Sequence, residues 1–181
     1  MEQSRADQPR GDQAPTDHAF ADPAGRPTAD AAVVLRELAY GGGSTAALIA
    51  AIQQELIERY GGPDETPVDP ADFAPPDGVF LVAQRAGEIV ACAGLRRHGE
   101  DAVELKRMYV RPAHRRTGLG RLLLGALEEH ARRSGHRQLV LETGTGQPEA
   151  IALYESAGYL PVPPFGHYAD APESRSYGKA L

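Results

Sequence analysis

The sequence predicts a single α/β domain, and two patterns along the chain support this fold class. Three runs typical of β-strands follow one another at 79–84, 89–95 and 102–110. The clearest amphipathic helix comes next, at 118–133, and a short apolar run at 138–142 follows it. A strand–helix–strand order of this kind makes the flanking strands parallel when the helix crosses over the sheet. At 181 residues the chain is long enough to form one hydrophobic core.

The remaining elements are shorter, and each is predicted from apolar, turn-forming and capping residues. Apolar residues from Leu48 to Ile57 lie on one helical face, and Ser44 or Thr45 is the candidate N-cap. In chain order we expect a strand at 32–38, a helix at 46–60, a loop at 61–78, a hairpin connection at 85–88, a helix at 149–157, and strands at 159–162 and 174–180 around a loop at 161–172. Residues 1–30 contain almost no large apolar side chains, which predicts a disordered tail.

Composition excludes several classes of function. The formal net charge is −6, whereas general nucleic-acid binding requires a broad basic face. A single cysteine, Cys92, excludes an intrachain disulfide framework and suits a reducing compartment. The first residues lack the apolar core of a secretory signal, and no apolar run approaches the ~20 residues that cross a bilayer. We therefore expect a cytoplasmic protein without nucleic-acid or membrane partners, and no residues have the spacing of metal ligands.

The most informative stretch covers residues 104–121, which hold six basic side chains and one acid. It alternates as a strand does, breaks at Pro112, and then opens a helix with the pattern Arg115-x-x-Gly118-x-Gly120. Free N–H groups at a helix N-terminus bind anions, and glycines allow the anion to approach closely. The pattern therefore indicates a pyrophosphate site. The alternative is a glycine-rich helix start with a solvated basic face.

Two common phosphate-binding motifs do not fit this stretch. No Gly-Lys-Ser/Thr follows the glycines, and Leu123 stands where Gly-x-Gly-x-x-Gly requires its third glycine. The block from Val110 to Gly120, Val-x-Pro-x-x-Arg-x-x-Gly-x-Gly, instead resembles the coenzyme-A signature of the GCN5-related N-acetyltransferases (GNAT). A second block from Ala150 to Tyr159, Ala-Ile-x-Leu-Tyr-Glu-x-x-Gly-Tyr, resembles the C-terminal motif of the same family.

The resemblance implies both a fold and a cosubstrate. The fold is a mixed, mostly antiparallel seven-stranded sheet with two splayed parallel central strands, flanked by about four helices. An N-acetyltransferase domain would then occupy residues 31–181, after the tail. Acetyl-CoA is the implied cosubstrate, with its pantetheine arm against the end of one central strand and its pyrophosphate on the following turn. The implied acetyl-CoA-binding residues are Met108, Tyr109, Val110, Arg115, Arg116, Thr117, Gly118, Leu119, Gly120 and Arg121.

The resemblance also implies two catalytic residues. Tyr154 is the candidate general acid, because an unperturbed phenol with a pKa of ~10 is protonated at neutral pH and can donate to the departing thiolate. Glu104 is the candidate base, and it is expected to share a strand face with Lys106 and Met108. The alternatives are a packing role for Tyr154, a surface ion pair for Glu104, and an ordered water or the backbone as the base.

The acceptor side is less well defined. Arg96 is a candidate for a substrate carboxylate, with a solvated strand end as the alternative. Glu142 and Thr143 end the second central strand, and Tyr168 is expected to wall the acceptor pocket. The predicted reaction is direct acetyl transfer, in a ternary complex, to the primary amine of an amino acid, a polyamine or an amine antibiotic. A protein lysine or N-terminal acetyltransferase and a non-catalytic acyl-CoA-binding regulatory domain are the alternatives, and a homodimer is possible.

Overall fold

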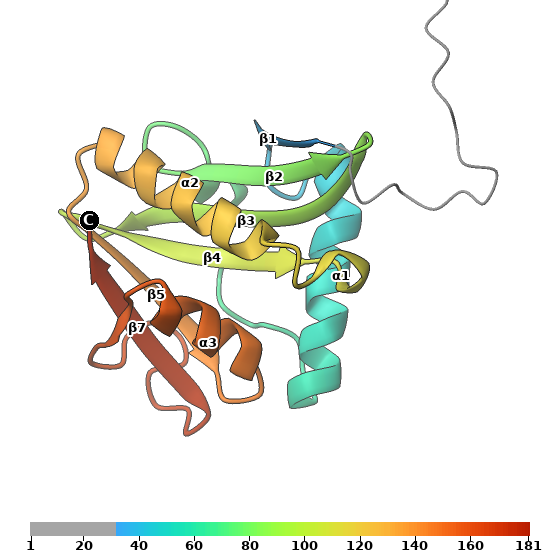
Figure 1. Ribbon diagram of the computed structural model, residues 1–181. Helices are drawn as coiled ribbons and strands as arrows, with labels where there is room; N and C mark the ends of the chain where they lie inside the picture. The colour runs from blue at the N-terminus through green and yellow to red at the C-terminus, as the bar shows by residue number, and fades with distance from the viewer. Residues whose placement is uncertain (1–31) are drawn as a thin grey trace, which may run out of the picture. The chain divides into compact units, whose positions relative to one another are not determined.

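The computed structural model describes residues 32–181, which form strands and helices (Figure 1). The predicted tail at 1–30 lies outside the described residues. None of the helices between residues 32 and 181 has the length and apolar character needed to span a bilayer. In chain order the elements are β1 (Val33–Glu37), α1 (Gly43–Tyr60), η1 (Pro70–Phe73), β2 (Val79–Arg85), β3 (Glu88–His98), β4 (Ala102–Val110), η2 (Pro112–His114), α2 (Leu119–Arg133), β5 (Gln138–Gly144), α3 (Pro148–Ser156), β6 (Leu160–Pro161) and β7 (Ser174–Ala180).

The seven strands form one sheet in the order β1-β2-β3-β4-β5-β7-β6, which confirms the predicted fold class. All neighbours are antiparallel except β4 and β5, which run parallel on either side of the α2 crossover. The parallel pairing ends at Leu105 opposite Leu141, although β4 continues to Val110 and β5 to Gly144. The two central strands therefore separate at their carboxyl ends, and this separation makes room for a site.

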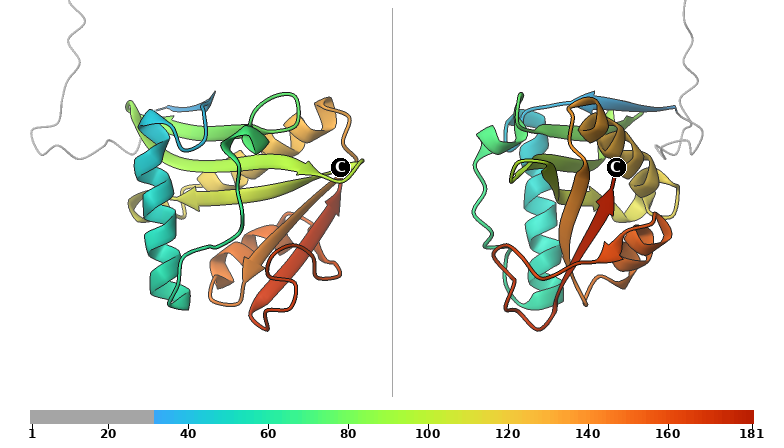
Figure 2. Two further views of the ribbon diagram at one scale, coloured as in Figure 1. Left: turned by 180° about the vertical axis from the view of Figure 1, so that it is seen from behind. Right: turned by 90° about the vertical axis from the view of Figure 1, so that its left-hand side faces the viewer.

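Helices cover both faces of the sheet, and a separate cluster of apolar side chains lies beneath each layer (Figures 1 and 2). On one face α2 and α3 pack over the larger cluster, which includes Leu123, Leu127 and Leu141. On the other face α1 and η1 cover a smaller cluster built around Phe73 and Phe80. The described residues thus contain three α-helices and two 3₁₀-helices, where about four helices were expected.

The first half of the chain differs from prediction at two places. Helix α1 begins at Gly43 with Gly42 as its N-cap, so the predicted caps Ser44 and Thr45 lie inside it. The Thr45 hydroxyl instead lies 2.8 Å from the carbonyl oxygen of Ala39. The expected loop at 61–78 contains η1, which buries Phe73 in the core. Packing of that ring against the sheet, which no local pattern encodes, orders the segment.

A β-bulge in β4 decides which side chains face the site. The pairing with β3 shifts between Cys92 and Gly94, and Arg107 has a positive φ of 57°. A bulge inserts one residue, so side chains beyond it switch faces. Glu104 and Lys106 consequently lie on the α1 face, while Met108 packs with the α2 cluster. The expectation that Met108 shares a face with Glu104 was wrong because the bulge breaks the two-residue period.

Candidate active site

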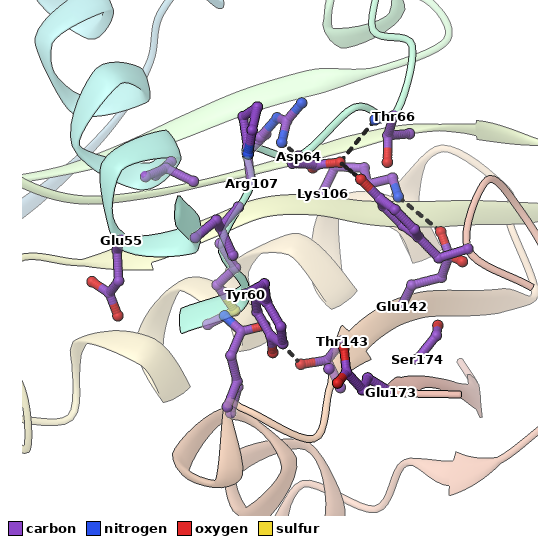
Figure 3. A pocket seen from close by; sticks show the side chains of 18 of the residues that line it. Glu55, Tyr60, Asp64, Thr66, Lys106, Arg107, Glu142, Thr143, Glu173 and Ser174 are labelled. Atoms are coloured by element: carbon purple, nitrogen blue, oxygen red, sulfur yellow. Dashed lines mark hydrogen bonds and ion pairs between the residues drawn. The ribbon is translucent and has the colours of Figure 1, made fainter. Parts of the chain in front are cut away.

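A cavity of 550 Å³ lies where β4 and β5 separate (Figure 3). Its walls come from segments that are far apart in the sequence: α1 and the loop after it, the ends of β4 and β5, the start of α3, and the loop before β7. Because the cavity reaches both Tyr154 on α3 and Tyr60 on α1, it connects the two faces of the sheet through the gap between the strands. It is larger than a second cavity, of 380 Å³, which lies between β1 and α2.

Tyr154, the candidate general acid, lies at the α3 side of the cavity. Its side chain is 6% exposed, and its hydroxyl lies 3.6 Å from the sulfur of Met108, a weak acceptor. Burial raises the pKa of the Tyr154 hydroxyl well above its ordinary value. The phenol therefore stays protonated through the neutral range, as a proton donor must.

Glu104, the predicted base, lies outside the set of described residues that line the cavity. It is 2% exposed and is held between two cations. Arg96 Nε donates a hydrogen bond of 2.8 Å to Glu104 Oε2, and Lys106 Nζ lies 2.8 Å from Oε1 as an ion pair outside hydrogen-bond geometry. Arg96, the candidate for binding a substrate carboxylate, is occupied by this contact with Glu104. It also donates a 3.0 Å hydrogen bond to the carbonyl of Pro67, and it does not line the cavity.

Glu142 occupies the position that suits a base. Its side chain is 5% exposed, it lines the cavity, and its Oε2 accepts a 3.0 Å hydrogen bond from Lys106 Nζ. Its Oε1 is buried without a partner among residues 32–181. A buried carboxylate oxygen without a partner is costly, so such an atom commonly marks a binding or catalytic position. Sequence reasoning placed Glu142 only with the substrate residues. The signal it lacked was the pairing that occupies Glu104.

Gly166 explains why the loop before β7 can close against this carboxylate. A Cβ atom at Gly166 would lie 2.6 Å from Glu142 Oε2, and the residue has a positive φ of 77°. Any side chain here would therefore displace either the loop or the Glu142 carboxylate, and it would adopt a strained backbone conformation. Glycine at this position allows the backbone to pass directly beside the buried acid.

Two loops meet above the cavity and form its roof, which we define as Asp64, Glu65 and Tyr168. The Tyr168 hydroxyl accepts a 2.7 Å hydrogen bond from the Glu65 amide and lies 3.2 Å from Asp64 Oδ1. Asp64 also forms an ion pair with the bulge residue Arg107, whose side chain is 4% exposed. Burial raises the pKa of Asp64, but hydrogen bonding from Thr66 and the charge of Arg107 outweigh it, so the pKa is lowered overall. Tyr168 thus walls the pocket, in the position expected of it.

The turn at 115–120 exposes main-chain N–H groups, as its sequence predicted. Arg116 and Gly118 both have positive φ, 61° and 86°, and Gly118 is the N-cap of α2. The first intrahelical donor is the amide of Leu122, which bonds the Gly118 carbonyl. The amides of residues 119–121 therefore have no partner within the helix and point out of its N-terminus, an arrangement that binds phosphate groups.

The side chains of this turn do less than expected. Arg115 pairs with Glu55 of α1, donates a 2.9 Å hydrogen bond to the Val110 carbonyl and lies over the Tyr109 ring. Arg121 donates to Ser156 at 2.7 Å, whereas Arg116 is exposed. A Cβ atom at Gly120 would lie 3.1 Å from Leu153, so this glycine serves helix packing as well as access. Of the three arginines, Arg116 is the one that the described contacts leave available to an anion.

Only some of the other predicted residues line the cavity. Met108, Tyr109 and Thr143 line it. Val110 packs in the α2 cluster, and the Thr117 hydroxyl donates to the His114 carbonyl at 2.7 Å. Among residues 32–181, no three His, Cys, Asp or Glu side chains are grouped to hold a metal ion.

Tyr60 is a cavity residue that sequence reasoning missed. Ile52, Leu56 and Tyr60 follow one another at four-residue intervals along α1, and all three line the cavity. A Cβ atom at Gly144 would lie 2.2 Å from the Tyr60 hydroxyl, so the ring is seated against the bare backbone at the end of β5. The four-residue spacing was visible in the sequence, but it gave no sign that the stripe faces a cavity at its end.

Comparisons with known proteins agree on one family. The model of the acetyltransferase (GNAT) family matches residues 49–159. The IAA acetyltransferase of Azospirillum brasilense is 38% identical over 135 residues, which are 74% of this chain and 88% of that protein. A crystal structure from Klebsiella pneumoniae, assigned to the acyl-CoA N-acyltransferases, is 33% identical with a TM-score of 0.69, covering 85% of this chain and 99% of that one.

A further solved structure shares the fold at lower identity. It is a GNAT acetyltransferase from Elizabethkingia anophelis with acetyl-CoA bound, 19% identical with a TM-score of 0.61. The alignment covers 82% of this chain and 98% of that one. At this identity the likeness concerns the arrangement of strands and helices alone.

Proposed function

Because the chain belongs to the GNAT family of acetyltransferases, we propose that it moves the acetyl group of acetyl-CoA to a primary amine of a small molecule. The observation that carries this proposal is the roofed cavity between the splayed strands, with a buried carboxylate at one wall and a buried phenol at the other. A protein substrate would need an open groove for an extended chain. The contacts of Asp64 and Glu65 with Tyr168 join the two loops over the cavity, which supports a small acceptor.

The residues present fit acetyl-CoA as the cosubstrate. The unpartnered amides at the start of α2 and the exposed Arg116 suit a pyrophosphate. The end of β4 beyond Leu105 no longer pairs with β5, so its backbone groups near Met108 are available to the amide groups of a pantetheine arm. When bound, acetyl-CoA supplies the acetyl group as a thioester.

We assign the two proton transfers to Glu142 and Tyr154. An alkyl ammonium has a pKa near ~10, so the amine must lose a proton before it can attack. Glu142, which lines the cavity and has a buried Oε1 without a hydrogen-bond partner among residues 32–181, is the acceptor that we assign. The Tyr154 hydroxyl, held neutral by burial, donates its proton to the sulfur of the departing thiolate. Glu104 is the weaker candidate for the base, because cations contact both of its oxygens.

Direct transfer is favoured over an acyl-enzyme. The chain has one cysteine, Cys92, which is fully buried in the sheet and does not line the cavity. Burial raises the pKa of its thiol far above the neutral range, so it is a poor nucleophile. Catalysis then rests on holding the two reactants together and on moving two protons.

Release of the CoA thiol across a panel of amines tests the proposal. The panel should contain amino acids, diamines and amine antibiotics, together with IAA because of the relative named for it. We expect acetyl-CoA-dependent thiol release with at least one small amine. If the protein binds acetyl-CoA in a calorimeter but releases no thiol with any acceptor, it is an acyl-CoA-binding domain and the proposal is wrong.

A further inference from the structure

A second carboxylate, that of Glu173, lines the same cavity as Glu142. In the register of β5 with β7, Gly144 is opposite Ser174, and the Thr145 amide donates a 2.9 Å hydrogen bond to the Glu173 carbonyl. Glu173 therefore lies opposite Thr145, which is three residues beyond Glu142 along the chain. At the rise of a strand this separation is about 10 Å. Both line the cavity, and Figure 3 labels Glu173 among the lining side chains, together with Thr143 and Tyr60.

The charges around the two carboxylates differ. Near Glu142, the cations Lys106 and Arg96 balance the acids Glu104 and Glu142. Glu173 has no cation within ion-pair distance among residues 32–181. Its sequence neighbour Arg175 donates to the carbonyl oxygens of Pro172 and Ser174 instead. Glu173 is exposed, so a solvated carboxylate that no described side-chain cation pairs with lies at the outer end of the cavity.

An apolar wall connects the two ends. Ile52, Leu56 and Tyr60 line the cavity from the α1 side, and the Tyr60 ring lies at the outer end, where the charge of Glu173 helps to raise its pKa after the larger effect of burial. A carboxylate beside an aromatic face suits an alkyl ammonium. Neighbouring Arg59 is occupied by Glu55, Glu149 and the Gly146 carbonyl.

We infer that the acceptor is an aliphatic diamine, with its reacting amine at Glu142 and its second cation held by Glu173 and Tyr60. The inference rests on the proposed acetyl transfer and narrows its substrate. An alkyl chain lies along Ile52 and Leu56, and the unpartnered Oε1 of Glu142 accepts from the amine at the strand gap. In the transfer, one ammonium proton passes to Glu142, and the amine nitrogen forms a bond to the acetyl carbon as the carbon–sulfur bond breaks. The thiolate takes the Tyr154 proton, and the second proton that nitrogen loses on becoming an amide restores the Tyr154 hydroxyl.

Steady-state kinetics with three matched acceptors tests the inference. The acceptors are 1,5-diaminopentane, 1-aminopentane and 5-aminopentanoate, which share chain length and differ at the far end. We expect kcat/KM to be highest for the diamine, by about fivefold over the monoamine, as for one partly screened ion pair, and lowest for the carboxylate. In Glu173→Gln the diamine-to-monoamine ratio should fall to about one through KM, while Glu100→Gln, in the exposed turn before β4, should keep the wild-type ratio.

The outcomes separate the two proposals. If none of the three acceptors and no other amine releases thiol, acetyl transfer to small amines is wrong. If amines are acetylated but the diamine has no advantage, or Glu173→Gln preserves the advantage, the diamine inference alone is overturned. A preference for 5-aminopentanoate would overturn it as well, because that result requires a cation at the outer end of the cavity.

Discussion

The turn at 115–120 and the acceptor cavity meet at the end of β4, but they are built in opposite ways. The turn presents main-chain N–H groups fixed by two residues of positive φ, and its arginine side chains largely serve packing. The cavity is lined by charged and aromatic side chains from segments up to about a hundred residues apart, such as Asp64 and Tyr168. Changes that alter the backbone should therefore impair the turn. Side-chain changes as small as one atom should impair the cavity.

The largest effect is expected in the cavity, from Glu142→Gln. The amide cannot take the ammonium proton, so kcat should fall by about 10²–10⁴-fold. Glu104→Gln is the matched comparison, because it makes the same change in the acid that does not line the cavity. Steady-state thiol release checks both variants. An equal or greater loss of kcat in Glu104→Gln, with the fold intact by circular dichroism, would return the role of base to Glu104.

Asp64→Asn should break the roof and lower stability. It leaves the buried Arg107 without its anionic partner, which costs about 3 kcal/mol in the free energy of unfolding. Asp77→Asn is the control, since the ion pair of Asp77 with Arg97 is half exposed and should change stability by less than about 1 kcal/mol. Urea denaturation measures both. Equal midpoints for the two variants would show that the roof contact adds nothing.

The same pair predicts a pH dependence. The folded-state pKa of Asp64 is lowered, so the contribution of this carboxylate to stability is complete above its unfolded pKa of about 3.9 and is lost as the pH falls through the folded value. Wild type and Asp64→Asn should accordingly converge in unfolding free energy on acidification. A gap that stays constant down to pH 2 would contradict the assignment.

Tyr154→Phe should reduce kcat by about 10²-fold, the lower end for a lost general acid. Because burial raises the pKa of this hydroxyl, the donor stays protonated in the alkaline range, and kcat of the wild type should show no alkaline decline below pH 10. A pH–rate profile checks this. An alkaline limb near pH 8 that disappears in Tyr154→Phe would mean that the phenol titrates normally and that its burial is overstated.

The smallest effect, in the turn, should come from Gly118→Ala. A Cβ atom there would meet no atom within 4 Å, so the change adds only the cost of a positive φ, about 1–2 kcal/mol. We expect acetyl-CoA to bind about 5- to 30-fold more weakly by calorimetry. Arg116→Ala removes an exposed charge and leaves the backbone, and it should weaken binding less. The reverse order would mean that side chains, rather than amides, hold the anion.

This contrast explains what the sequence could predict. The turn and the motif around Tyr154 are each a continuous run of sequence. Their residue spacing therefore indicated both the family and the fold, including the parallel pair of β4 and β5. Glu142 and Glu104 are indistinguishable as strand acids until Arg96 and Lys106 are seen to occupy one of them. The bulge at Arg107 and the burial of Phe73 depend on tertiary packing, which short-range patterns do not contain.

The central claim, that a roofed cavity selects small amines, is tested most directly by competition in one reaction. The protein and acetyl-CoA would be mixed with 1,5-diaminopentane and with an unstructured peptide that carries a lysine and a free N-terminus, at equal amine concentrations. Mass spectrometry would then identify the acetylated products. The cavity and its Asp64–Tyr168 roof predict acetylation of the diamine and an unmodified peptide. Acetylated peptide beside unmodified diamine would contradict the account.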